Sequence, residues 1–134
     1  MSQENVEKIK RAIASLNVGD DDGVLADFHP DVEWRDLMHA PDVPERVRGV
    51  AAVRTIMDQW NETFDEFTAE IDEYIDAGDR VVCVTHWRAK GKGSGVAIDL
   101  HAADVYEFKD GQVVRVTQGY PDKAAALEAA GLSE

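Results

Sequence analysis

Cysteine and basic residues are scarce in this sequence of 134 residues. Cys83 is the only cysteine, so no disulfide can form within the chain and nothing points to an oxidising compartment. Lys and Arg number 14 against 27 Asp and Glu, which gives a formal net charge of −13. The basic residues form no patch that would neutralise phosphates, so we expect neither nucleic acid nor an anionic membrane surface as a partner.

Long apolar runs are missing as well. The first ten residues are polar and charged, without the apolar core of a signal peptide, and no run approaches the length of a membrane span. We therefore expect a cytoplasmic protein. The length, with 44% hydrophobic and 31% charged residues, suits a single globular domain over residues 1–134.

Apolar residues recur at helical spacing near the start of the chain, in its middle and at its end. The predicted helices cover residues 6–16, 24–28, 53–60 and 123–130. Gly19 ends the first, and Pro30 stops the second. Asp122 is a suitable N-cap for the last.

A two-residue period marks the strands. Val32, Trp34 and Asp36 share one face of a short strand over residues 31–36. Four further strands are expected at residues 64–76, 80–90, 96–108 and 112–120, and turns between them are short enough to make an antiparallel meander. Residues 37–49 have no periodicity and predict a long loop that covers a pocket.

Helices first and a twisted antiparallel meander afterwards predict an α+β fold, with the N-terminal helices on one face of the sheet. Three stretches then resemble the nuclear transport factor 2-like superfamily. They are FHPDVEWRD (28–36), RGVAAVRTIMDQW (48–60) and HAADVYEFKDGQVVRVTQGY (101–120). That superfamily includes ketosteroid isomerases, SnoaL-type polyketide cyclases, scytalone dehydratase and a non-catalytic transport factor. The resemblance implies a cone-shaped, cystatin-like curved sheet around a central pocket, and it leaves the activity open because this fold hosts unrelated chemistries.

Two carboxylates are the candidate catalytic residues. Asp36 resembles the general base of ketosteroid isomerases, and Asp104 resembles the aspartic acid of their oxyanion hole, while Ala12 stands where they have a tyrosine. From the pattern alone, Asp104 lies in an apolar strand face, so burial should raise its pKa and keep it protonated as a donor. Asp36 at a strand end should be more solvated and ionised. The structural alternatives are an Asp104 bonded inside the fold and an Asp36 that caps the following loop.

The candidate ligand-binding residues are mostly aromatic. Several of them point toward one interior by periodicity, although aromatic residues also simply fill cores. Gln118 would place an amide in the same interior, and His39 is close enough in sequence to join Asp36. The full set is Trp34, His39, Trp60, Trp87, Tyr106, Gln118 and Tyr120.

No metal or cofactor is expected. The four histidines and single cysteine show no paired ligand spacing, and the glycines at 91–95 belong to a hairpin turn. His86 and His101 should lie on the sheet face opposite Asp104. That outer face should also carry Val82, Val84, Val105 and Val113, which predicts a homodimer through it.

The leading hypothesis is an isomerase, cyclase or dehydratase that needs no cofactor and moves a proton next to a carbonyl of a small apolar molecule. Asp36 would take the proton and Asp104 would stabilise the oxyanion. The alternative is a non-catalytic ligand-binding or dimerisation module with the same fold.

Overall fold

The computed structural model describes residues 2–37 and 45–132. Its helices are α1 (Ser2–Asn17), α2 (Asp21–Leu25), α3 (Val50–Thr63) and α4 (Lys123–Ala129). Its strands are β1 (Phe28–Asp36), β2 (Arg46–Arg48), β3 (Phe64–Asp76), β4 (Arg80–Gly91), β5 (Ala97–Lys109) and β6 (Gln112–Tyr120).

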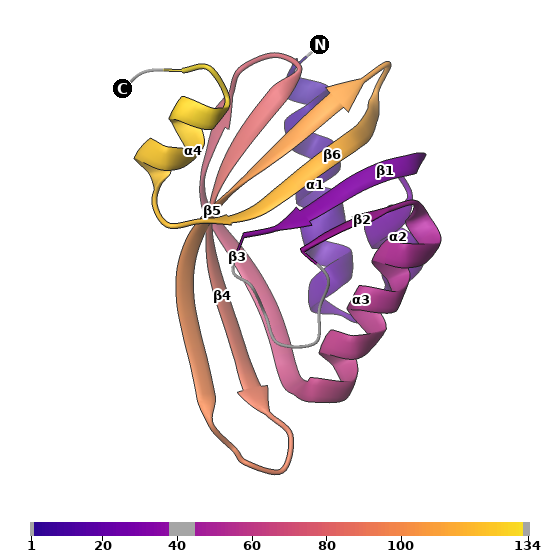
Figure 1. The fold of residues 1–134 in the computed structure, drawn as a ribbon, viewed down its shortest axis with the longest axis vertical. Coiled ribbons are helices and arrows are strands. Elements are labelled where there is room, and N and C mark those ends of the chain that lie inside the picture. Colours follow the sequence, from indigo (N-terminus) through magenta and orange to yellow (C-terminus); the bar gives the residue numbers. More distant parts are fainter. Residues whose placement is uncertain (1, 38–44, 133–134) are drawn as a thin grey trace.

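The strands form one curved six-stranded sheet in the order β2-β1-β6-β5-β4-β3 (Figure 1). Strands β3 to β6 make the predicted antiparallel meander. The tight turn between β5 and β6 follows from Asp110 and Gly111, whose φ angles of 53° and 81° suit the hairpin turns that match strand twist. The α+β fold with a curved, open sheet is confirmed.

The joining of β1 to the sheet was not predicted. β1 pairs with β6 in parallel, in contrast to every other pairing of the sheet within the described residues. β1 also begins at Phe28, three residues earlier than expected, because the strand passes through Pro30 at an irregular stretch of the pairing between Phe28 and Glu33. Proline is tolerated in a strand at such an irregularity.

Part of the segment predicted as a loop is also a strand. Residues 46–48 form β2, which pairs antiparallel with residues 33–35 of β1. Residues 38–44 of the predicted covering loop lie outside the described part of the chain.

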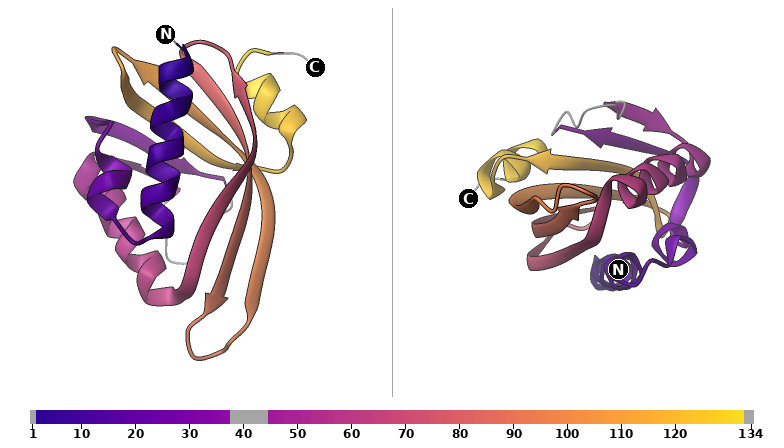
Figure 2. Two further views of the ribbon diagram at one scale, coloured as in Figure 1. Left: turned by 180° about the vertical axis from the view of Figure 1, so that it is seen from behind. Right: turned by 90° about the horizontal axis from the view of Figure 1, so that it is seen from below.

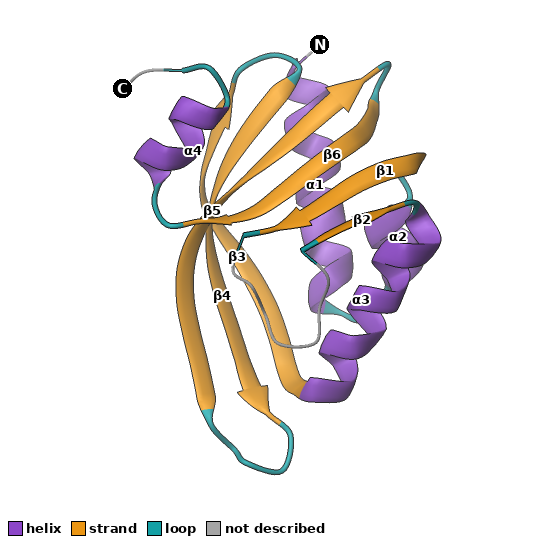
Figure 3. Ribbon diagram, viewed as in Figure 1, coloured by secondary structure: helices purple, strands orange, loops and turns teal. Residues whose placement is uncertain are grey.

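Helices α1, α2 and α3 lie on one side of the sheet, and α4 lies on the other (Figures 2 and 3). The apolar face of α1 explains its position, since Val6 and Ile9 are buried in the same core as Phe28 and Val32 of β1. Asn17 anchors the end of α1, because its amide exchanges hydrogen bonds of 2.9 and 2.8 Å with the backbone of Ala69 in β3. The inner face is therefore closed by helices along much of its length.

The outer face of the sheet is less exposed than predicted. Val82 and Val105 pack with Ala126 and Leu127 of α4 and are buried. Val113 lies in the inner core instead, because a register shift between Glu107 and Phe108 changes the alternation of the hairpin. Three of the four valines that were expected to be exposed on the outer face, and so to favour a homodimer, are therefore buried.

None of the helices in the described ranges has the length and apolar character needed to cross a membrane.

Candidate functional site

Asp36 stands at the C-terminal end of β1, beside β6. In the parallel pairing of the two strands it lies opposite Gln118, and the two residues are only 2% and 3% exposed. The backbone is held on both sides: the N–H of Asp36 donates to Glu45 O, and the N–H of Leu37 donates to Gln118 O, each at 2.8 Å. The sheet thus fixes a carboxylate and an amide next to each other.

A cavity of about 210 Å³ opens beside this pair. Asp36 and Gln118 supply polar groups to its wall, and Arg88 contributes as well. The remaining wall is apolar and is formed by Trp60, Phe64, Phe67, Trp87, Ala89, Ile98 and Leu100. Apolar walls with a few placed polar groups are typical of small-molecule sites.

Aromatic rings form a continuous series along the cavity. The ring centroids of Trp34 and Trp60 are 5.6 Å apart, those of Trp60 and Phe67 5.3 Å, and those of Phe67 and Trp87 5.4 Å. These spacings are within the usual range of attractive aromatic pairs. The series comes from β1, α3, β3 and β4, so it joins the helical layer to the sheet.

A second, smaller space of about 30 Å³ lies against helix α1. It shares Trp60 and Trp87 with the larger cavity, and Trp34, Tyr106 and Ala12 also line it. Burial raises the pKa of Tyr106 well above its usual value, so its hydroxyl stays neutral. The methyl group of Ala12 offers no hydrogen bond at this wall.

Two indole groups of these walls have an unsatisfied donor. Trp34 Nε1 and Trp87 Nε1 are buried without a hydrogen-bond acceptor among the described residues. A buried donor left unpaired costs roughly 1–3 kcal/mol. An oxygen acceptor on a bound molecule would recover this cost.

Asp104 belongs to β5, and its carboxylate is bonded inside the fold. Thr85 Oγ1 donates to Asp104 Oδ2 at 2.9 Å, and the Gly119 N–H donates to Asp104 Oδ1 at 2.9 Å. Gly119 has a positive φ of 96° and directly follows Gln118, the residue opposite Asp36. Asp104 therefore holds the backbone that carries the cavity amide.

The environment of Asp104 raises its pKa to about 6, chiefly because of burial. The hydrogen bonds from Gly119 and Thr85 oppose this shift, while the charge of Asp36 adds to it. The predicted direction of the shift is correct. A pKa of about 6 lets the Asp104 carboxyl bind or release a proton near neutral pH.

Several expectations about individual residues need correction. Asp36 was expected to be partly solvated, but it is buried because β2 and β6 flank the end of β1. Tyr120 was expected in the cavity, yet it packs on the outer face with the residues that contact α4. The register shift between Ala103 and Val105 in the β5–β6 pairing adds one residue to β6. The side chain of Tyr120 therefore points to the opposite face of the sheet from the one predicted. His39 lies outside the described residues.

The structure brings the other candidates together around the two spaces: Trp34, Trp60, Trp87, Tyr106, Asp36 and Gln118. Phe64 and Phe67, which are three residues apart in β3, were not predicted to line the cavity. A register shift between Asp65 and Thr68, with Glu66 at a φ of 54°, lets both phenylalanines face the cavity. Strict alternation could not have found them.

The sequence matches the family model of the SnoaL-like domain over residues 9–116. The chain belongs to this family. No curated protein matches its sequence.

Solved structures with the same fold cover nearly the whole chain. A nuclear transport factor 2-like protein of unknown function from Burkholderia pseudomallei has a TM-score of 0.80 and 23% identity, covering 93% of this chain and 95% of that one. TerC, co-crystallised with polyporic acid, has a TM-score of 0.79 and 24% identity over 93% and 96% of the two chains. A ketosteroid isomerase-like protein from Catenulispora acidiphila, in complex with trimethylamine, has a TM-score of 0.75 and 16% identity over 94% and 93%. These likenesses establish the fold.

Proposed function

We propose that this SnoaL-like protein binds a small, mainly apolar molecule in the tryptophan-lined cavity and moves a proton on it without a cofactor. Asp36 is the proton acceptor. The observation that carries this proposal is a carboxylate only 2% exposed in the wall of an otherwise largely aromatic cavity. A carboxylate in the wall of a cavity can act as general base on a bound molecule that lies within hydrogen-bond reach.

The walls favour a planar molecule that carries a carbonyl oxygen. Aromatic rings stack well on flat ligands, and the unpaired donor Trp87 Nε1 of this cavity suits an oxygen acceptor. Gln118 beside Asp36 adds an amide that can orient the same molecule. Removal of a proton next to the carbonyl then develops negative charge on an oxygen that an indole N–H stabilises. An isomerase, a cyclase or a dehydratase can begin with this step.

In this proposal Asp104 is a positioning residue. Its hydrogen bond to the Gly119 N–H fixes the backbone after Gln118, and it lines neither of the two cavities in the described part of the chain. Proteins with this fold have been crystallised with small organic molecules, as the structures with polyporic acid and trimethylamine illustrate. We further propose a cytoplasmic location and a homodimer through the uncovered part of the outer sheet face.

The test begins with ligand identification. Native mass spectrometry of the purified protein and a panel of aromatic ketones and quinones would supply a binding molecule. All 3 tryptophans of the chain line the two spaces, so binding should quench the intrinsic fluorescence.

Asp36→Asn tests the chemistry. We expect turnover to fall by about 10²–10⁴-fold, because the base acts in the transition state, while the fluorescence-derived affinity stays within a few fold. Asp31→Asn is the matched control, since Asp31 is an exposed aspartate of the same strand. Full turnover by Asp36→Asn would contradict the proposed base.

A non-catalytic binding module is the second candidate. The internal bonds of Asp104 favour it, because they engage the carboxylate that would otherwise be the second catalytic group. Tight binding without turnover of any panel member would support this candidate.

A further inference from the structure

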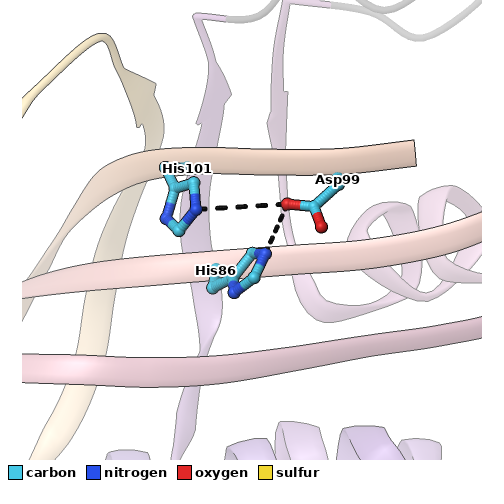
Figure 4. A group of neighbouring side chains, drawn as sticks. All are labelled: His86, Asp99 and His101. Atoms are coloured by element: carbon cyan, nitrogen blue, oxygen red, sulfur yellow. Dashed lines mark hydrogen bonds and ion pairs between the residues drawn. The ribbon is translucent and has the colours of Figure 1, made fainter.

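Three side chains on the outer face of the sheet, away from the cavity, converge on one point. They are His86 of β4 and Asp99 and His101 of β5 (Figure 4). Asp99 Oδ1 lies 2.5 Å from His86 Nε2 and 4.0 Å from His101 Nε2. The three ligand atoms all lie within 4.8 Å of one another.

The strand register produces this convergence. His86 and His101 are direct partners in the antiparallel pairing of β4 and β5, and their rings stack with centroids 4.0 Å apart. Asp99 precedes His101 by two positions, so both side chains leave β5 on the same face. Neighbouring strands thus supply a pair of imidazoles and a carboxylate without a recognisable sequence motif.

We propose that His86 Nε2, Asp99 Oδ1 and His101 Nε2 bind a divalent transition-metal ion of the Zn²⁺ type, with water at the remaining positions. Two imidazoles and a carboxylate form a common donor set for such ions. Bonds of about 2.0–2.1 Å in tetrahedral geometry place the donor atoms roughly 3.4 Å apart. The 4.0 Å separation of Asp99 from His101 must shorten toward that value, and the 2.5 Å separation of Asp99 from His86 must lengthen toward it.

The donor atoms can reach the spacing of a metal site through movement of exposed side chains. The side chains of Asp99 and His101 are 64% and 65% exposed and can rotate, whereas that of His86 is 12% exposed and is held by its neighbours. Binding therefore requires rotation of two surface side chains and no movement of the sheet. The metal proposal does not rest on the proposed function of the cavity, although Arg88 lines the cavity and also contacts His86.

Arg88 opposes metal binding in a specific way. Arg88 Nη2 lies 3.2 Å from His86 Nδ1, so the guanidinium donates to that nitrogen and leaves the ring proton on Nε2. A metal ion at Nε2 requires the proton to move to Nδ1, which removes this hydrogen bond. Arg88 also adds a positive charge beside the ion. Its removal should strengthen binding.

Isothermal titration of the full, untagged chain with ZnCl₂ and with CoCl₂ tests the proposal. We expect one ion per chain, and bound Co²⁺ should give the visible absorption bands of a site with a low coordination number. His101→Ala and Asp99→Asn, at exposed positions, each remove a proposed ligand and should weaken binding by at least about tenfold, the lower end of the loss caused by changing groups that only support a metal ligand. Arg88→Ala should tighten binding several-fold.

His29→Ala is the control, because His29 lies in β1, outside the cluster. The affinity of this variant for Zn²⁺ and Co²⁺ should equal that of the wild type, and circular dichroism should show that all variants are folded. The proposal is overturned if wild-type protein binds no ion, or if His101→Ala and Asp99→Asn bind as tightly as the wild type. Activity measurements on the cavity do not enter either outcome.

Discussion

Asp104 is a buried carboxylate, and none of its hydrogen-bond partners in the described structure is a cation. Its partners are a hydroxyl and a backbone N–H, and the nearby Asp36 repels its charge. The protonated form of Asp104 is therefore more favoured in the native state than in the unfolded chain. This property makes its contribution to stability depend on pH.

Asp104 should destabilise the native state as the pH rises. Its pKa is raised from 3.8 to about 6, so between these values the native state binds more protons than the unfolded state and stability falls with increasing pH. The shift corresponds to about 3 kcal/mol. The wild type should lose stability between pH 4 and pH 7.5, and Asp104→Asn should not. The free energy of unfolding of Asp104→Asn minus that of the wild type should therefore increase by up to about 3 kcal/mol over this pH range. Denaturant unfolding at both pH values measures it, and Glu128→Gln, an exposed change in α4, should show no such trend.

Cys83 should be inert toward thiol reagents. It is fully buried, and burial together with the charge of Asp104 raises its pKa well above the usual value. We expect labelling by a disulfide reagent to occur only at the rate of unfolding, and to become rapid in denaturant. Labelling within seconds in native buffer would show that the side chain is accessible.

At the level of elements, α4 is a short helix that covers the sheet. Asp122 caps it by accepting a hydrogen bond of 2.8 Å from the Ala125 N–H. Leu127 is 5% exposed and packs with Val82 and Val105. The stability of this part of the outer face therefore depends on a few side chains.

Leu127→Ala should lower the free energy of unfolding by about 2–5 kcal/mol, because it leaves a cavity between α4 and the sheet. Chemical denaturation provides the measurement. Glu128→Ala changes the adjacent, exposed residue and should cost less than about 0.5 kcal/mol. Similar losses in the two variants would mean that α4 does not pack on the sheet as described.

The sequence predicted regular elements better than their irregularities. The four long strands of the meander lie within about a residue of the predicted bounds, because their alternation and turn residues are unambiguous. Bulges reversed the expected direction of Tyr120 and Val113 and brought Phe64 and Phe67 to one face. A bulge depends on the partner strand as well as on local residues, so alternation alone cannot place it.

For the whole molecule, the surface proposed to join two copies is the part of the outer face that α4 leaves uncovered. Val84 lies there, next in alternation to His86. We expect sedimentation at micromolar concentration to give the mass of two chains. Val84→Glu should produce single chains, whereas Val18→Glu, at a position 80% exposed after α1, should not. A wild-type mass of one chain would contradict the homodimer.

The cavity itself was predicted from the family resemblance and from residue type more than from geometry. Trp34, Trp60 and Trp87 were predicted to face one interior because each is large, apolar and periodic with its neighbours, and they line the walls of the two spaces. The burial of Asp36 could not be predicted, because it depends on β6, which lies far along the chain.

The parallel pairing of β1 with β6 also has a consequence for how the chain folds. Glu33 of β1 and Arg115 of β6 are 82 positions apart, and Asp36 meets Gln118 in the same pairing. During synthesis on a ribosome, the meander of β3, β4 and β5 can form while β1 still lacks its partner. The carboxylate and amide of the cavity come together only when the last strand has emerged. Contacts between such distant segments slow folding, so the cavity should be among the last parts of the protein to form.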